Sequence, residues 1–265
     1  MTTLRPTDDV RRRNHGEWCE RNADAPAAAL FTLVMVHRRQ LGTIVTRGVS
    51  TAGDGAARLI DDHLAALAEG VGAPAGGEPT RMSWLEFALN PFPDLFAMPP
   101  GGVSAKGKDA LLRKRLTDGQ IDVVYDWLTR TDHVMGGVLG MATYGGRVNG
   151  VAPDATASAQ RDSILDVACH ARWLDPREAE RDLAWVRGFY RDLFAESGGV
   201  PVPGERCDGA FINHPDVDLA DPALNTSGVP WHTLYYKANY PRLQRVKARW
   251  DPLDVFRHAL SVRAE

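Results

Sequence analysis

The apolar run at residues 29–36 constrains the fold of this chain more than any other stretch. It is short, continuous and bounded by polar residues, a pattern that predicts a buried strand. Residues 42–48 follow at hairpin distance and are rich in β-branched side chains, which favour strands. This predicted strand pair makes a sheet the expected centre of the fold.

Three later stretches carry the periodicity and start signals of helices. The first is expected to begin with Asp54 as N-cap, and it places His63 on its apolar face, where a histidine is more often a core residue than a ligand. The second begins at a capping box formed by Thr117 and Gln120, and the third and longest begins at Asp175. Strands are predicted at 133–144, 163–173 and 209–213. Tight strand–strand turns in this order predict an α+β fold, a mainly antiparallel sheet with helices packed on one face.

Composition excludes several classes of function. The formal net charge of −3 over 265 residues gives no electrostatic footprint for nucleic acid. No stretch approaches the roughly 18 apolar residues of a membrane-spanning helix, so we expect no membrane partner. Three cysteines without CxxC spacing favour neither a disulfide framework nor a metal site, and they fit a cytoplasmic location.

Two segments contain residues typical of the lining of a ligand-binding site. Residues 82–105 hold Trp84, Phe87 and Phe92, which either line a hydrophobic pocket, together with Trp173, or pack as an irregular loop over the core. The strand predicted at 133–144 is rich in glycine, which lets a flat ligand approach the backbone closely.

The C-terminal part of the chain carries a longer signature. The sequence WHTLYYKANYPRLQRVKARWDPLDVF at 231–256 resembles the C-terminal signature of the berberine-bridge-type flavin oxidases, which share the vanillyl-alcohol-oxidase flavin fold. Segments at 144–149, 155–163, 185–190 and 198–204 resemble the same family in the same order, and are most similar to its bacterial members that oxidise sugars and natural products. The resemblance extends from about Arg11 onward.

This resemblance implies a division of the chain. Residues 1–230 would form the substrate-binding α+β domain, and 231–265 would pack against a flavin-binding domain. The reaction implied is hydride transfer to FAD from an alcohol group of a sugar or polyketide-like small molecule. No glycine-rich phosphate loop follows a predicted strand, so FAD is expected to come from a separate flavin-binding polypeptide or from a domain outside this chain.

The resemblance also implies site residues. The family tyrosine before Gly-Gly is Tyr144, and the motif Tyr-x-Asn-Tyr-Pro-Asp is Phe-Ile-Asn-His-Pro-Asp here, so that both of its tyrosines are replaced, by Phe211 and His214. Tyr144 and His214 are the expected catalytic residues. His214 would act as the base at neutral pH, or it remains in a site no longer used for catalysis.

Asn239 and Tyr240 match the segment that runs beside the flavin, and they are the expected cofactor-binding residues. Asn239 is alternatively the cap of a helix that begins at Tyr240. A last helix is expected from Asp251, with Val255, Phe256 and Leu260 on its docking face.

Three readings of the chain stay open at this point. The first is the substrate half of an FAD-dependent oxidoreductase. The second is a flavin-independent cyclase, isomerase or binding protein derived from that half, which the loss of both motif tyrosines favours. The third is a truncated product with no role of its own.

Overall fold

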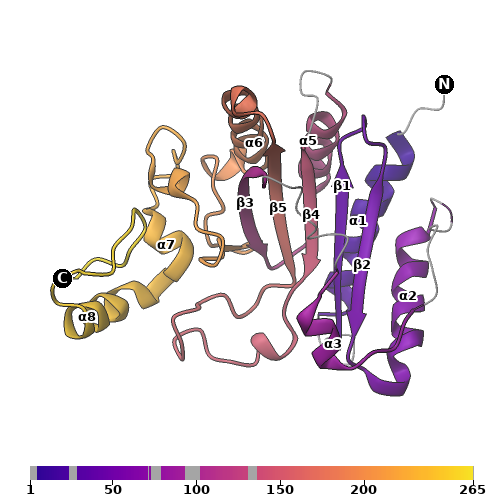
Figure 1. Cartoon of the computed structure of the whole chain (residues 1–265), viewed down its shortest axis with the longest axis horizontal. Coiled ribbons are helices and arrows are strands. Elements are labelled where there is room, and N and C mark those ends of the chain that lie inside the picture. Colours follow the sequence, from indigo (N-terminus) through magenta and orange to yellow (C-terminus); the bar gives the residue numbers. More distant parts are fainter. Residues whose placement is uncertain are drawn as a thin grey trace.

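A six-stranded sheet forms the body of the protein in the computed structural model (Figure 1). The structure describes residues 5–23, 29–70, 72, 79–92, 102–130 and 136–264, with side chains from Arg13 onward. The strand order is β2-β1-β4-β5-β3-β6 and every neighbouring pair is antiparallel. The strands are β1 (Leu30–His37), β2 (Ile44–Ser50), β3 (Ser104–Leu112), β4 (Val138–Thr143), β5 (Leu165–Trp173) and β6 (Cys207–Gly209).

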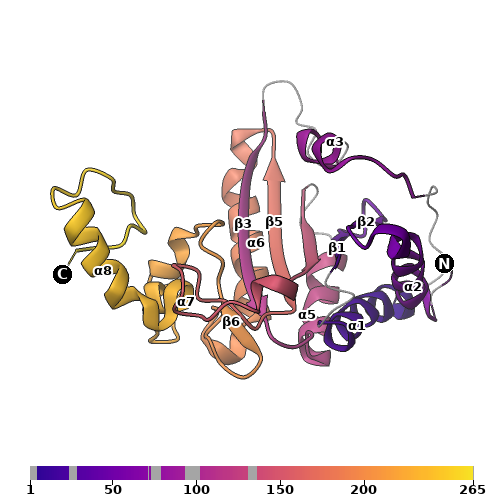
Figure 2. The same ribbon diagram turned by 90° about the horizontal axis from the view of Figure 1, so that it is seen from below.

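Four helices form a continuous row against the sheet. Helix α6 contacts α5, α5 contacts α1, and α1 contacts α2, while α6 packs on β5 and β3, and α2 on β2. Helix α3 lies on the opposite side of the sheet from α1, α2 and α5, and the tail helices project away from the sheet (Figure 2). The helices are α1 (Arg5–Arg21), α2 (Ala56–Ala68), α3 (Trp84–Leu89), α5 (Asp118–Thr129), α6 (Ala179–Leu193), α7 (Trp231–Tyr236) and α8 (Tyr240–Trp250). Short 3-10 helices are η2 (Gly53–Gly55), η3 (Gly146–Val148), η4 (Pro176–Glu178), η5 (Ala195–Ser197), η6 (Val217–Ala220) and η7 (Lys237–Asn239).

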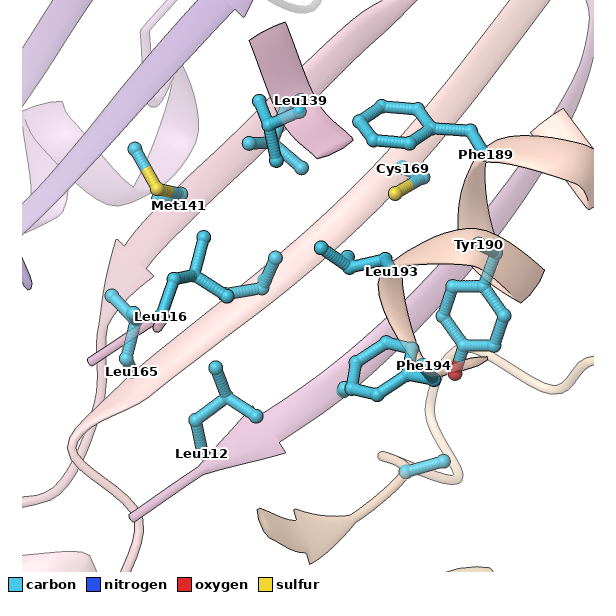
Figure 3. Close-up of a cluster of buried hydrophobic side chains, with 14 of the residues drawn as sticks. Leu112, Leu116, Leu139, Met141, Leu165, Cys169, Phe189, Tyr190, Leu193 and Phe194 are labelled. Carbon is cyan, nitrogen blue, oxygen red and sulfur yellow. The ribbon is translucent and has the colours of Figure 1, made fainter. Parts of the chain in front are cut away.

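The core lies between the sheet and this row of helices. Alternate strand residues such as Leu139 and Cys169 point toward Phe189 and Leu193 of α6 (Figure 3). Because side chains alternate along a strand, the residues between them face away from the helices. We call that second side the open face, and it carries Gly107, Asp109, Gly140, Asp166 and His170.

The α+β fold with helices on one face is confirmed. The hairpin is β1 and β2, with Leu33 opposite Arg47. The Thr117 capping box is also present, with Thr117 Oγ1 accepting from the Gln120 N–H and Gln120 Oε1 accepting from the Thr117 N–H. Asp175 begins the η4–α6 segment, as its charge and the following proline predict.

Strand β3 is absent from the prediction, because its residues Lys106, Lys108 and Asp109 do not form an apolar pattern. Their burial depends on distant partners. Lys106 and Lys108 both form ion pairs with Asp216, and Lys108 Nζ also lies 3.1 Å from Asp218 Oδ2. A charged strand therefore lies inside the protein because another segment neutralises it.

Other local predictions need correction. Asp54 lies within η2, and the N-cap of α2 is Gly55, which makes no side-chain cap bond. Residues 84–89 of the aromatic segment form a helix with its own capping box, while 93–101 lie outside the described residues. Strand β6 ends at Gly209 and so precedes most of the predicted 209–213 strand. Residues 133–135 of the strand predicted at 133–144 also lie outside the described part.

The helix expected from Asp251 does not form. The Asp251 carboxylate instead accepts hydrogen bonds from the N–H groups of Val255 and Phe256, which folds the chain into an irregular turn after α8. Leu260 is buried as expected, whereas Val255 and Phe256 are exposed. An aspartate can stabilise such a turn as readily as a helix start, because its side chain competes for backbone N–H groups in both.

Two histidines are buried where α1 meets α2. His63 lies edge-to-face on Trp18 at a centroid distance of 4.4 Å, and its ring centroid is 5.6 Å from that of His15. Burial lowers the pKa of His15 to about 3 and that of His63 to about 4. His63 is therefore a neutral core residue at pH 7, as its place on the apolar face predicts.

These histidines predict a loss of stability on mild acidification. A group whose pKa is lower in the folded state binds fewer protons there, so stability falls as the pH drops below the unfolded pKa of about 6.5. Each histidine then accounts for a loss of about 2 kcal/mol between pH 7 and pH 5. We expect His63→Leu to remove its share, so that urea unfolding at the two pH values gives a smaller difference than in the wild type.

His258→Leu provides the matched control, because His258 is exposed in the tail. It should retain the wild-type difference between pH 7 and pH 5. The raised pKa of Asp166 acts with the opposite sign, so the measured quantity is the difference between variant and wild type. Equal pH dependence in His63→Leu and the wild type would contradict the prediction.

Candidate functional site

The candidate site lies on the open face, where β3 and β5 meet the segment that follows β6. Asp109 comes from β3 and Asp166 from β5, and His214 lies in the loop after β6. Leu111 pairs with Asp166 and Asp109 pairs with Ala168, so the two acids are diagonal neighbours on one face. Three groups that can exchange protons are therefore held together by the register of the sheet and one loop.

Asp109 fixes the loop that carries His214. Its Oδ2 atom lies 3.5 Å from His214 Nδ1 and accepts a hydrogen bond of 3.2 Å from the Phe211 N–H. Its backbone oxygen accepts a 2.6 Å hydrogen bond from the hydroxyl of Tyr190 on α6. Asp109 is only 3% exposed, while His214 is half exposed, so the imidazole reaches from a buried anchor toward solvent.

The electrostatics of this group are unusual. Burial and the neighbouring Asp109 raise the pKa of Asp166 to about 7. Burial also raises the pKa of Asp109, against the effect of His214. The hydrogen bond to Asp109 raises the pKa of His214. Carboxyl groups that hold protons near neutral pH are common at reaction sites, because proton transfer needs groups poised near the working pH.

Tyr144 lies at the same end of the sheet. Its N–H donates to the Ile164 oxygen at 3.0 Å, which continues the β4–β5 pairing. Its ring meets Phe211 edge-to-face at 6.2 Å, and Phe211 meets His214 at 5.5 Å. Burial raises the pKa of Tyr144. The structure thus brings both predicted catalytic residues, Tyr144 and His214, into one aromatic row with Phe211 between them.

The next residue, Gly145, explains how Tyr144 is held. Its φ of 112° is in a region that side chains rarely adopt, and a Cβ there would lie 2.9 Å from the Ser163 oxygen. The Asn149 amide donates to that same oxygen at 2.8 Å. The Tyr-Gly-Gly turn is therefore a closely packed bend that orients the tyrosine.

Small residues flatten the open face beside this row. Gly140 and Ala168 pair directly between β4 and β5, and Gly107 of β3 pairs with His170 of β5. The ring of His170 covers Gly107, where a Cβ would come within 2.8 Å of its Nδ1 atom. Burial lowers the pKa of His170 to about 4, so this ring is neutral at pH 7. A flat ring system can approach such a surface closely, because few side chains project from it.

Asn239 and Tyr240 lie elsewhere, in the tail. The Asn239 amide donates to the oxygens of Pro153 (2.7 Å) and Thr156 (3.1 Å). Asn239 occupies the N-cap position of α8, which begins at Tyr240 as the alternative predicts, but its side chain makes no cap bond. Tyr240 stacks on His232 at 4.0 Å. Both residues are buried. Their role beside a flavin stays a prediction, and the structure shows them fastening the 151–157 loop and the tail.

The tail carries an exposed apolar surface, which includes Val255 and Phe256 of the expected docking face but not the buried Asn239 and Tyr240. It lies on α8 and the turn after it, where we name it the tail surface: Val246, Trp250, Leu253, Val255 and Phe256. Trp250 is 75% and Phe256 79% exposed. Large apolar groups gathered at one place are typical of a surface that meets another protein part.

Sequence reasoning missed Asp109 and Asp166. Asp109 lies in the strand that was not predicted. Asp166 had a detectable signal, since it is a charged residue inside the otherwise apolar stretch at 163–169. An acid within a predicted strand is costly to bury unless it is paired, so it is a candidate site residue.

Comparison with known proteins places these features in a family. Residues 210–263 match the family model "Berberine and berberine like". The chain is 48% identical over 255 residues to aclacinomycin-N/aclacinomycin-A oxidase of Streptomyces galilaeus, covering 94% of this chain and 46% of that protein. Hexose oxidase of Chondrus crispus is 32% identical over 170 residues, 59% of this chain and 31% of the oxidase.

Two solved oxidase structures have the same fold as this chain. The crystal structure of aclacinomycin oxidoreductase superposes with a TM-score of 0.90 at 45% identity, over 98% of this chain and 52% of that one. A glycopeptide hexose oxidase complexed with teicoplanin superposes with a TM-score of 0.84 at 44% identity, over 96% and 51%.

The fold therefore matches about half of each of these solved oxidases. The chain is similar to the berberine-bridge-enzyme-like FAD-linked oxidases, and it spans about half the length of the curated relatives it matches. FAD is the cofactor of this family, and the matched relatives are oxidases. Within the part of the chain that the structure describes, no helix is both long and apolar enough to cross a membrane.

Proposed function

We propose that this chain is the substrate-binding portion of an FAD-dependent oxidoreductase that oxidises an alcohol group of a sugar or polyketide-like natural product. The observation that carries the proposal is the pairing of His214 with the buried Asp109 beside Tyr144 on the open face. The fold likeness to aclacinomycin oxidoreductase and glycopeptide hexose oxidase supports it.

Oxidation of an alcohol requires a proton acceptor as well as a hydride acceptor. In the proposed role, His214 Nε2 takes the hydroxyl proton while the carbon–hydrogen bond breaks and the carbon–oxygen double bond forms. Bound FAD supplies the hydride acceptor. Asp109 holds the Nδ1 side of the ring and stabilises the imidazolium that results. Tyr144, with a raised pKa, stays a neutral phenol at pH 7 and can donate a hydrogen bond to the same substrate oxygen.

Two small residues of the open face would leave room for a flat ring. Gly140 and Ala168, paired between β4 and β5, let a planar substrate or cofactor lie close to the backbone. Asn239 is more limited, because the hydrogens of its amide already serve the 151–157 loop. Asn239 and Tyr240 would therefore act on the flavin through the shape of that loop and through ring contact.

A second group of aromatic side chains, on β1 and around α3, favours a ring-containing substrate. Phe31 stacks on Phe92 at 6.4 Å, Phe92 meets Phe87 at 5.3 Å, and Trp84 lies 5.5 Å from Phe87. Because Leu33 pairs with Ala142, Phe31 and Tyr144 lie at the same end of the sheet on the same face. This second aromatic group thus lies at the same end of the sheet as the proposed catalytic residues. It would suit stacking of a polyketide-like ring system or the hydrophobic face of a sugar.

The tail surface is the proposed contact with a flavin-binding domain or polypeptide, since the relatives are about twice as long as this chain. We expect Trp250→Ser to weaken that contact by at least tenfold in dissociation constant, because exposed aromatic anchors dominate such interfaces. Sedimentation or calorimetry with the flavin-binding part measures it. Leu89→Ser is the control, since Leu89 is 77% exposed on α3, remote from the tail. Equal loss in both variants would contradict the assignment.

The alternative is a flavin-independent cyclase, isomerase or binding protein, favoured by the replacement of both motif tyrosines by Phe211 and His214. Absorption spectra separate the two. The flavin-loaded assembly should lose its visible flavin band when substrate is added without oxygen, and regain it in air. Conversion of substrate by this chain alone, with no flavin band retained after gel filtration with FAD, would establish the alternative.

A further inference from the structure

The open face contains one more acid than the proposed base needs. Asp109 alone accounts for the orientation of His214, yet Asp166 lies in the same group. Oxygens of both carboxyl groups and a ring nitrogen of His214 lie within 4.8 Å of one another. The Oδ1 atom of Asp166 is buried and, among the described residues, has no hydrogen-bond partner.

Two carboxylates at this separation repel each other strongly when water is excluded. The cost falls when one proton stays on the pair, because only one of the two carboxyls is then charged. Lys106 and Lys108, on the helix-covered side of β3, form ion pairs with Asp216 and Asp218 instead of with Asp109 and Asp166. The titratable groups that interact with the pair from the surrounding elements are Tyr144, Tyr190, His214, Asp216 and Tyr235.

We propose that Asp109 and Asp166 share one proton and together position His214, with Nδ1 directed to Asp109 and Nε2 facing the substrate. Asp166 is then a positioning residue that acts through Asp109. The inference deepens the proposed function, on which the base role of His214 rests, but the shared proton is a property of this chain alone.

A shared proton has a direct consequence for the resting charge. With one proton on the pair and a neutral His214, the group carries one negative charge, and it becomes neutral when His214 takes the substrate proton. The charge that develops on the imidazole is thus compensated without a second buried anion. The raised pKa of Asp166, about 7, and the raised pKa of His214 agree with this arrangement.

The experiment is a nuclear magnetic resonance titration of the purified chain, without flavin or substrate. Carboxyl carbon signals of labelled aspartate should show one of the pair titrating near pH 7, and ring nitrogen signals should show neutral His214 with its proton on Nδ1. His214→Gln assigns the imidazole signals. If both carboxyls titrate independently near pH 4, the shared proton is ruled out, whatever the chain catalyses.

Substitutions separate positioning from packing. Asp109→Asn should lower the proton affinity of His214 about tenfold and randomise its tautomer. Asp166→Asn leaves the one negative charge of the pair entirely on Asp109, so it should raise that affinity about threefold. Asp122→Asn is the matched control, because Asp122 is exposed on α5 on the far side of the sheet, and it should leave His214 unchanged. An unchanged His214 titration in Asp166→Asn would overturn the proposal. The wild-type carboxyl titration tests it independently if a variant folds poorly.

A cation could use the same three groups, and it is tested with Zn²⁺ and Mn²⁺ added separately. Broadening or shift of the His214 signals at micromolar metal would assign the cluster to a cation and overturn the shared proton. Unchanged signals support it. If the wild-type chain in its flavin-loaded assembly shows no oxidase activity, but its Asp109–Asp166 pair titrates as expected, the result would count against the proposed function alone.

Discussion

His214→Gln should lower the rate of substrate oxidation by about 10² to 10⁴, the range that a positioned general base contributes. Glutamine retains a hydrogen-bonding side chain of similar reach, but it has no nitrogen that accepts a proton. Because the imidazole reaches outward from Asp109, its loss removes the proton acceptor and leaves the Asp109–Phe211 bond in place. Rapid-mixing measurement of anaerobic flavin reduction in the flavin-loaded assembly reports this step directly.

The pH dependence of the oxidation rate tests whether His214 acts as a base. A base must be unprotonated, so the rate in the wild type should rise with pH through the pKa of His214, which lies above its usual value because of Asp109. In His214→Gln that rise should be absent. His232→Gln is the control, because His232 lies in the tail stacked on Tyr240. A rate within a factor of three of the wild type in His214→Gln would make His214 a bystander and leave Tyr144 as the candidate base.

Asp208→Ala should lower the free energy of unfolding by about 3–5 kcal/mol, the cost of breaking a buried ion pair by removing one partner. The carboxylate is completely buried, and it accepts from Arg113 Nη2 at 2.6 Å, from Ser163 Oγ at 2.8 Å and from Lys237 Nζ. Without the carboxylate, the Arg113 and Lys237 cations face each other where water screens their charges poorly. Lys237 also has a φ of 49°, a conformation that needs its side-chain anchor.

Asp162→Ala is the matched control, since Asp162 binds the same arginine, at 2.7 Å from Arg113 Nε, but is 59% exposed. An exposed ion pair contributes at most about 1 kcal/mol, so the variant should stay near the wild type. Urea unfolding at pH 7 measures both. Equal losses in the two variants would show that Asp208 is solvated in solution and that the tail is fastened by its apolar contacts.

Local patterns predicted the parts of the fold whose stabilising contacts are close in sequence. The β1–β2 hairpin and the Thr117 capping box depend on neighbouring residues, so their signals are complete within a short stretch. Strand β3 depends on Asp216, about a hundred residues away, and no local pattern contains that information. The helix expected at Asp251 failed because the same side chain can hold a turn by accepting from Val255 and Phe256.

The residues of the candidate site likewise include some that the sequence predicts and others that only the fold brings together. Tyr144 and His214 were found because they occupy motif positions, and the structure places them in one aromatic row. Asp109 and Asp166 belong to no motif, and only the pairing of β3 with β5 brings them beneath His214. The functional assignments of these residues remain predictions, while their proximity is a feature of the fold.

The position of β3 between β5 and β6 has a consequence for how the protein folds. β3 precedes β4 and β5 in the chain, yet it must pair with β5 and later accept β6 on its other edge. Such non-local pairing requires long loops to close before it gains stability, which slows folding. Asp109 and His214 therefore meet only after most of the sheet has assembled. We expect the site to be the last part acquired during refolding, in the phase with the slowest rate.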